Sequence, residues 1–213
     1  MAKSPIEVRN AKLGPKVVKA LQNRRFDAWY VEEPQEAVEK VFSLIPQGNV
    51  IGWGGSLTVE TLGLTRLARE KEYLVLDRDA VPQEDRVETM RKVLTCDTFL
   101  GSSNAISEDG QLVNIDGFGN RVAAMIFGPK QVILVAGINK ITKTLEDAYT
   151  RAKTIAAPLN AQRFPQKKIP CLETGSCSGC TSPDSICTFI ITTRLCNPPG
   201  RIKVILIGKD LGL

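Results

Sequence analysis

The sequence predicts an α/β fold in which a mostly parallel sheet is covered by helices on both faces. Short apolar runs alternate along the chain with segments of helical periodicity, and this alternation is typical of β-α-β units. The runs end in glycines or turn residues, as strands do where they pass into loops. At 213 residues the chain is long enough to bury roughly 70% of its unfolded surface, so its core needs no disulfides.

The N-terminal region, residues 1–47, is predicted to form helices that pack on the core. An apolar stripe around Leu21 marks one helix, and a second begins at Pro34, a favourable first-turn residue, and stops at Pro46. We therefore divide the chain into these N-terminal helices and an α/β domain at residues 48–213.

Within the α/β domain, strands and helices are predicted to follow one another in order. The strand signals lie at residues 49–52, 73–76, 98–101 and 131–136. Helical patterns follow three of them, led by Val59, Val87 and Leu145. A turn at 108–110 joins two short apolar runs in a hairpin, and two β-rich segments, 187–195 and 201–207, close the chain. The long Pro- and Gly-rich stretch 158–183 is predicted to be a loop or small insert.

Composition excludes several classes of function. The sequence contains no histidine, which rules out Ser-His-Asp and Cys-His catalysis and any metal site with a histidine ligand. The net charge of +5 comes from scattered basic residues, and few aromatic residues are available for base stacking, so nucleic-acid binding is not expected. The mild positive excess suits a small anionic ligand, and equally suits a solvated basic surface.

Neither a membrane span nor export is expected. No apolar run approaches the ~18 residues of a membrane-spanning helix, and the first residues lack the apolar core of a signal peptide. We therefore expect a cytoplasmic protein, and the sequence leaves a homo-oligomer open.

A glycine-rich loop at residues 52–58, Gly-Trp-Gly-Gly-Ser-Leu-Thr, lies between a predicted strand and a predicted helix. Glycines allow a close approach of backbone to ligand, and a helix that starts there presents free N–H groups to an anion. Ser56 or Thr58 can cap that helix or bind the anion. Leu57 stands where a dinucleotide fingerprint needs a third glycine, and no Walker lysine follows, so the anion is not named. A tight turn with a serine cap is the alternative.

Two further loops are expected at the same edge of the sheet, because the carboxyl ends of parallel strands share one edge. They contribute a carboxylate, two amides and two cations: Asp116, Asn120, Asn139, Arg121 and Lys140. Glu60 lies one turn into the helix that follows the glycine loop. A carboxylate near a lysine and an anion pocket suits proton abstraction beside a carbonyl, or acyl transfer. Turn formation and surface solvation explain each of these residues singly.

Four of the six cysteines, Cys171, Cys177, Cys180 and Cys187, fall within seventeen residues. Thiolates are preferred ligands of Zn²⁺ and of Fe–S clusters, and without histidine such a site would be all-cysteine. Free or redox-active thiols and disulfides remain alternatives, although disulfides are disfavoured without export. The two remaining cysteines, Cys96 and Cys196, are expected to be buried as small apolar residues.

The motifs around these residues are similar to those of the lactate utilization (LUD) domain family. The similarity covers nearly the whole chain, and its matching pieces are residues 52–58 with Glu60, 101–106, 108–140, 171–187 and 202–212. It implies the α/β fold of the superfamily that contains ribose-5-phosphate isomerase, glucosamine-6-phosphate deaminase and CoA-transferases. Some relatives lack the cysteine-rich segment, so cluster binding does not follow from the resemblance.

Carried over by motif, the resemblance assigns three sets of residues to the site. The first glycine loop is represented by Gly54, Gly55, Ser56 and Thr58, the central motif by Asn104, Asp116, Gly117, Asn120 and Arg121, and the third motif by Asn139 and Lys140. It gives none of them a catalytic role; Glu60, Asp116 and Lys140 are our catalytic candidates from residue chemistry.

Three hypotheses for function follow. In the first, the protein serves oxidation of L-lactate to pyruvate, as relatives do beside Fe–S oxidoreductase subunits. It would bind a small anionic metabolite in the glycine loops and a metal centre, an Fe–S cluster or zinc, at the four cysteines. In the second, it is a stand-alone isomerase-like or CoA-transferase-like enzyme. In the third, it is a non-enzymatic metabolite-binding or assembly subunit with structural zinc.

Overall fold

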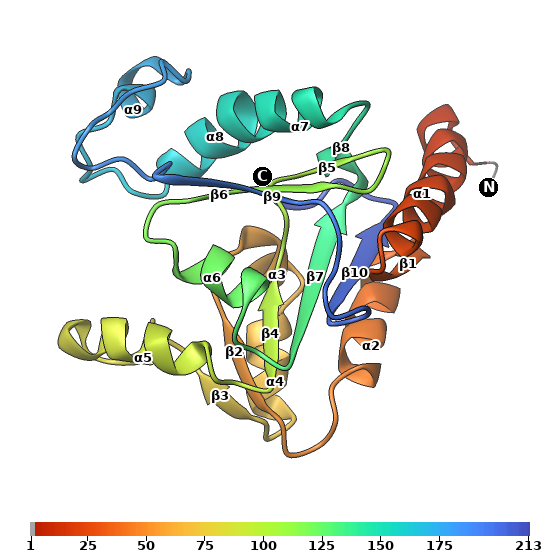
Figure 1. Cartoon of the computed structure of the whole chain (residues 1–213), viewed down its shortest axis with the longest axis horizontal. Coiled ribbons are helices and arrows are strands. Elements are labelled where there is room, and N and C mark those ends of the chain that lie inside the picture. The colour runs from red at the N-terminus through yellow and green to blue at the C-terminus, as the bar shows by residue number, and fades with distance from the viewer. Residues whose placement is uncertain (1–2) are drawn as a thin grey trace.

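The computed structural model describes residues 3–213, and its main sheet has six strands, all parallel, in the order β1-β10-β7-β4-β2-β3 (Figure 1). The strands are β1 (Asp27–Val31), β2 (Val50–Trp53), β3 (Leu74–Leu76), β4 (Thr98–Gly101), β7 (Gln131–Gly137) and β10 (Ile202–Ile207). The predicted α/β class with a mostly parallel sheet is therefore confirmed.

Helices cover both faces of this sheet. One face carries α1 (Pro5–Asn23), α5 (Arg86–Val93) and α6 (Asn120–Ile126); the other carries α2 (Pro34–Ser43), α3 (Leu57–Thr61) and α4 (Leu64–Glu70). Strand β7 is apolar along nearly its whole length because both of its faces are covered. Val132 and Leu134 pack into the first core, and Ile133 and Val135 pack into the second, so the strand is buried on both faces after Gln131.

A second, smaller sheet lies across the carboxyl edge of the first (Figure 1). Its order is β8-β5-β6-β9, formed by β5 (Ala105–Ser107), β6 (Leu112–Asp116), β8 (Ile141–Thr142) and β9 (Phe189–Thr193). The predicted hairpin is confirmed as the antiparallel β5–β6 pair, but the sequence did not predict a separate sheet around it. Helix α7 (Leu145–Arg151), a π-helical turn at Ala152–Ala156 and α8 (Ala157–Ala161) follow, and α7 and the π-helical turn supply alanines to this sheet's small core.

Several elements differ from the sequence-based expectation. Strand β1 lies between the two predicted N-terminal helices and pairs with β10 from the other end of the chain, a contact with no local signal. The helix predicted from Val59 onward is broken at Gly63, whose φ of +66° begins α4. Pro158 lies in the first turn of α8, where proline is tolerated, so the expected loop begins later and contains α9 (Pro170–Thr174).

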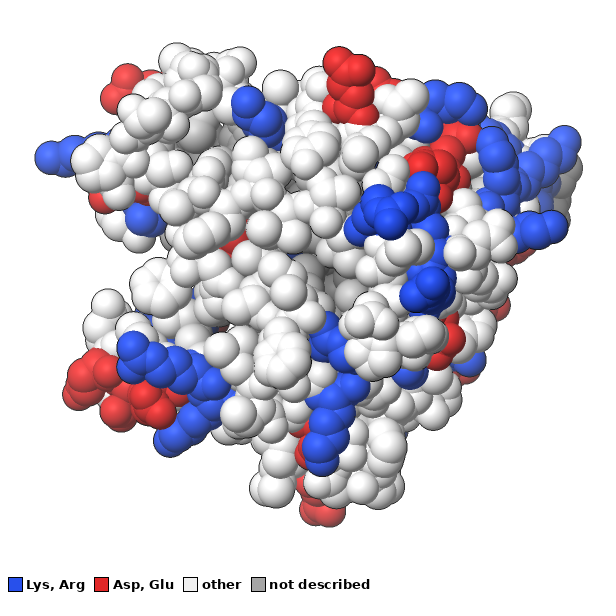
Figure 2. All heavy atoms as spheres, in the orientation of Figure 1, with Lys and Arg blue, Asp and Glu red and all other residues white. Residues whose placement is uncertain are grey.

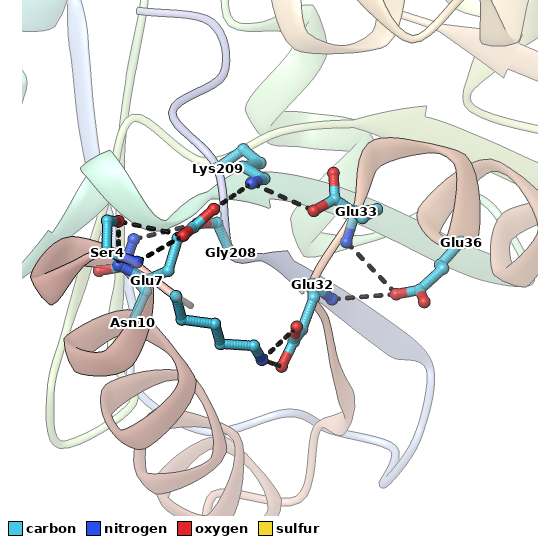
Figure 3. A network of polar contacts seen from close by, with 9 residues as sticks. Ser4, Glu7, Asn10, Glu32, Glu33, Glu36, Gly208 and Lys209 are labelled. Carbon is cyan, nitrogen blue, oxygen red and sulfur yellow. Dashed lines mark hydrogen bonds and ion pairs between the residues drawn. The ribbon is translucent and has the colours of Figure 1, made fainter. Parts of the chain in front are cut away.

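The segment after β10 is fixed by a polar network that joins three elements (Figure 3). Lys209 Nζ forms ion pairs of 3.1 Å with both Glu7 of α1 and Glu33 before α2. Asn10 Nδ2 donates to the carbonyl oxygen of Gly208 at 3.0 Å. These contacts direct residues 209–213 along the carboxyl edge of the sheet, where the candidate site lies.

On the face seen in Figure 2, blue and red atoms gather on the lower left lobe and along the right side, and the middle of the face is largely white. Among residues 3–213, no helix is both long and apolar enough to cross a lipid bilayer.

Candidate functional site

A pocket of about 620 Å³ opens at the carboxyl edge of the main sheet. The second sheet and α8 form its other walls together with residues 183–188, which follow the third cysteine of the cysteine-rich segment. Figure 2 shows the molecule hollowed on its left side, between the lobe that carries α9 and the one that carries α5. A pocket of this size accommodates a metabolite with room to spare.

The loops that the sequence placed at one edge meet in this pocket. Most of the sequence-predicted site residues line it: Gly55, Ser56, Thr58, Asn104, Asp116, Gly117, Asn120, Arg121 and Lys140. Those after β2, β4 and β7 meet there because parallel strands deliver their following loops to a common edge. Those after β6 arrive from the second sheet, which lies across that edge.

Three of the sequence-predicted residues lie outside the pocket lining. Glu60 is 47% exposed and forms an ion pair of 3.1 Å with Arg163 of the rim. Gly54 lies against the Arg121 side chain, whose Cγ would be 3.1 Å from a Cβ at position 54. Asn139 Oδ1 accepts from the N–H of Leu211 at 3.1 Å, so this amide holds the C-terminal segment.

The glycine loop ends in a short helix. Helix α3 has five residues, and the Val59 N–H donates to Ser56 Oγ at 3.4 Å, so Ser56 is its N-cap. A Cβ at Gly55 would lie 3.2 Å from the Arg78 guanidinium, which reaches the loop from the end of β3. Arg78 therefore adds a cation to the backbone N–H groups that the glycine loop presents to the pocket.

The Arg121 guanidinium is buried beneath the pocket and binds four oxygen acceptors. Its Nη1 donates to the Ser102 carbonyl at 3.1 Å and to Asn114 Oδ1 at 2.9 Å. Its Nη2 donates to Asn104 Oδ1 at 2.9 Å and to the Ile115 carbonyl at 2.6 Å. Arg121 thus ties the β4–β5 loop to β6, and Asn104 serves it as an acceptor.

The carboxylate of Asp116 is the cap of α6. Its Oδ1 accepts from the N–H groups of Phe118 and Gly119, both at 3.2 Å, and its Oδ2 from those of Arg121 and Val122 at 3.0 and 3.1 Å. It also lies 3.9 Å from the Nε of Arg121. Burial lowers the pKa of Arg121, and the charge of Asp116 opposes that shift. All this bonding makes Asp116 a support for Arg121 and α6.

Lys140 is buried without a counter-ion, and its amine is bonded only to two hydroxyl groups. It is 3% exposed, and its Nζ donates to Thr58 Oγ1 at 2.9 Å and to Ser102 Oγ at 3.0 Å. Among residues 3–213 no carboxylate lies within 4.0 Å of it. Burial, then the positive charges of Arg151 and Arg121, lower the pKa of Lys140 to about 7. A large fraction of this amine is therefore neutral near physiological pH.

The C-terminal segment covers Lys140 and completes its enclosure. Gly212 has a φ of +66°, and a Cβ there would lie 2.2 Å from Thr58 Oγ1 and 3.1 Å from Lys140 Nζ. Arg151 donates to the carbonyl of Asn139 at 3.0 Å and so fixes the turn that carries Lys140.

The four clustered cysteines are neighbours beside the pocket. Cys171, Cys177 and Cys187 are partly buried and Cys180 is exposed. Burial, followed by the charges of the other three, raises the pKa of Cys187 to about 11. Cys187 lies between Ile186 and Thr188, which both line the pocket. Cys96 and Cys196 are buried, as expected for small apolar residues.

This donor set, four thiols and no other ligand type, suits Zn²⁺ or an Fe–S cluster. In the part of the chain that the structure describes, no three His, Cys, Asp or Glu side chains are already arranged around a common metal position. Binding would therefore draw neighbouring sulfurs together and remove their protons.

Sequence reasoning missed several pocket residues. Arg78, Ser102, Arg163 and Lys167 all line the pocket. Ser102 follows strand β4, so its place after a strand end was a usable signal. Arg163 and Lys167 follow α8, and their arrival at this edge depends on how that helix crosses the second sheet, which no local pattern specifies.

The fold is that of an α/β protein with a pocket at the carboxyl edge of a parallel sheet. The sequence profile of the LUD domain matches residues 14–207, and the chain belongs to that family. No curated protein matches the chain.

A solved structure shows the same fold. A DUF162 family protein from Deinococcus radiodurans is similar over 93% of this chain and 98% of its own, with a TM-score of 0.54 and 12% identity. Ribose 5-phosphate isomerase A from Neisseria gonorrhoeae matches 53% of this chain and 54% of its own (TM-score 0.35, 14% identity). The enzyme from Methanocaldococcus jannaschii matches 64% and 56% (TM-score 0.31, 20% identity). The last two similarities are too weak to carry an argument about this chain.

Proposed function

We propose that the protein serves the oxidation of L-lactate or a similar small organic acid to the 2-oxo acid, with the acid bound in the pocket. The observation that carries this proposal is the number of positive groups that face one enclosed space without carboxylates to neutralise them all. Lys167 forms no ion pair among residues 3–213, and the acceptor of its Nζ is the Asp184 carbonyl at 3.3 Å. Such a pocket concentrates anions.

The cysteines give the second half of the proposal. Oxidation of a hydroxy acid to an oxo acid releases a pair of electrons and a pair of protons, and the electrons need an acceptor. An Fe–S cluster, when bound, accepts electrons one at a time. Cys171, Cys177, Cys180 and Cys187 would hold it, next to the pocket wall at residues 183–188. Separate Fe–S oxidoreductase subunits are the proposed partners.

Two alternatives remain distinct proposals. A stand-alone isomerase-like or CoA-transferase-like enzyme is favoured by the neutral amine of Lys140, which suits proton transfer. A binding or assembly subunit with structural zinc is favoured by the set of four neighbouring thiols, which is typical of structural zinc sites. Turnover by the isolated chain would support the first of these.

The anion site is tested by calorimetry with L-lactate, pyruvate and inorganic phosphate. We expect one of the two acids to bind, and Lys167→Ala to weaken that binding about tenfold, because it removes one charge from the pocket. Lys143→Ala is the matched control, since Lys143 is exposed and paired with Glu108 outside the pocket. Phosphate binding alone would contradict the acid as ligand, and no heat with any of the three would contradict the anion site.

The metal centre is tested by preparing the protein without oxygen and analysing iron, sulfide and zinc. We expect iron and sulfide in equal amounts and visible absorption from thiolate-to-iron charge transfer, all lost in Cys187→Ser. Cys96→Ser is the matched control, because Cys96 is buried away from the cluster. Colourless protein with zinc would support the structural-zinc alternative, and protein without metal would contradict both.

A further inference from the structure

We infer that Lys140 is a nucleophile that forms an imine with the carbonyl carbon of a 2-oxo acid bound in the pocket. This inference rests on the proposed function and deepens it, because it specifies the class of compound and a covalent contact. Four features of the structure carry it. The amine lies in the pocket wall, its nitrogen has a free lone pair, two hydroxyl groups can transfer protons, and the C-terminal segment shields the amine from bulk water.

Access comes from the position of the side chain. Lys140 follows β7, the central strand of the carboxyl edge, and it forms part of the pocket wall together with Ser56 and Asn120. A carbonyl compound bound in the pocket therefore lies beside the amine.

The hydrogen bonds of Lys140 Nζ leave its lone pair free. A neutral primary amine has two N–H groups and one lone pair. Both N–H groups are accounted for by Thr58 Oγ1 and Ser102 Oγ, at 2.9 and 3.0 Å. Among residues 3–213 no donor or carboxylate is bonded to Nζ, so the lone pair is left for an electrophile. An ammonium group would have a third N–H with no acceptor here, which is consistent with the neutral form.

The charges that face Lys140 also favour the neutral amine. The guanidinium groups of Arg121 and Arg151 disfavour a third positive charge, and burial adds to their effect. Two carboxylates face these arginines: Asp116 lies against Arg121 and is already bound by four N–H groups, and Asp210 acts on Arg151. Amine activation by desolvation and by neighbouring cations is a known way to obtain a lysine nucleophile.

The chemistry balances without any redox partner. The lone pair of Nζ adds to the carbonyl carbon, and the carbonyl oxygen becomes a hydroxyl. This carbinolamine then loses water as the C=N bond forms, and both amine protons leave in that water. Thr58 and Ser102 are within hydrogen-bond distance of Nζ and can relay the protons. The Gly212 segment covers the amine and limits the access of bulk water, which would hydrolyse the imine.

The experiment is reductive trapping with pyruvate and cyanoborohydride, followed by peptide mapping of the wild-type protein. We expect a reduced pyruvate adduct on Lys140, at least about tenfold more abundant than on the exposed Lys143, because the nucleophile is the neutral amine. L-Lactate, which has no carbonyl group, must give no adduct, and an excess of it should protect Lys140. Lys140→Met should lose the adduct.

The outcomes separate the inference from the proposed function. If pyruvate binds in calorimetry but no adduct forms on Lys140, the imine is wrong and the anion pocket stands. If adducts are spread over surface lysines at the level of Lys143, the imine is also wrong. If pyruvate neither binds nor reacts, both the inference and the proposed acid site fall.

Discussion

Replacing Lys140 with Met is expected to raise the free energy of unfolding at pH 7 by about 2 kcal/mol. The pKa of this buried amine falls from 10.5 to about 7, so folding at neutral pH must remove a proton or bury a charge. This fall of about 3.5 in the pKa, at about 1.4 kcal/mol per pKa unit, gives a penalty of roughly 5 kcal/mol, and the two lost hydrogen bonds, at about 1.5 kcal/mol each, offset about 3 kcal/mol of it. A residue that destabilises the fold is retained for another reason, and chemistry in the pocket supplies one.

The difference in stability between the wild type and Lys140→Met should depend on pH. Because the folded pKa lies below the unfolded one, the unfolded chain binds more protons between pH 7 and 10.5. The stability of the wild type should therefore rise with pH in this window, by up to about 1.4 kcal/mol per pH unit, relative to Lys140→Met. Below pH 7 both states carry the proton and the difference becomes constant.

The measurement is urea denaturation of both proteins at several pH values between about 7 and 9. Lys143→Met is the matched control: it removes a lysine three positions away that is exposed and paired with Glu108, so its effect should be small and independent of pH. A Lys140→Met protein that is less stable than the wild type, with the same pH dependence, would show that the amine is charged and well solvated.

The site was predictable to the extent that it depends on strand ends. Parallel strands place their following loops at one edge, so residues such as Ser56, Asn120 and Lys140 were assigned to one site from their position after strand or hairpin signals. The core strands were predictable from a second signal, because a strand that is buried on both faces is apolar at nearly every position.

The parts of the fold and of the site that could not be predicted depend on contacts between distant parts of the chain. Strand β1 is recognisable only beside β10, which is some 170 residues later in the sequence. Arg121 and Lys140 were expected as a pair of cations, and nothing local distinguishes a guanidinium bound by four oxygens from an amine with no counter-ion. That difference arises from Asn104 and Asn114 in the first case and from the crossing of Gly212 in the second.

The second large effect is expected for Asp116→Ala, which should lower the free energy of unfolding by about 4 kcal/mol. The substitution removes the cap that binds four N–H groups at the start of α6, and it leaves the buried Arg121 without its nearby negative charge. Loss of a helix cap costs about 1 kcal/mol, and removal of one partner from a buried charge pair costs several more.

Denaturation with urea at pH 7 checks this prediction, with Asp79→Ala as the matched control. Asp79 also lines the pocket, but its carboxylate is 62% exposed and lies 3.8 Å from Arg78, so its loss should change stability by less than about 0.5 kcal/mol. Asp116→Asn should fall between the two, since the amide oxygen can still accept from the helix N–H groups but carries no charge. An Asp116→Ala protein as stable as the wild type would mean that the carboxylate does not support the site, and it would restore Asp116 as a candidate base.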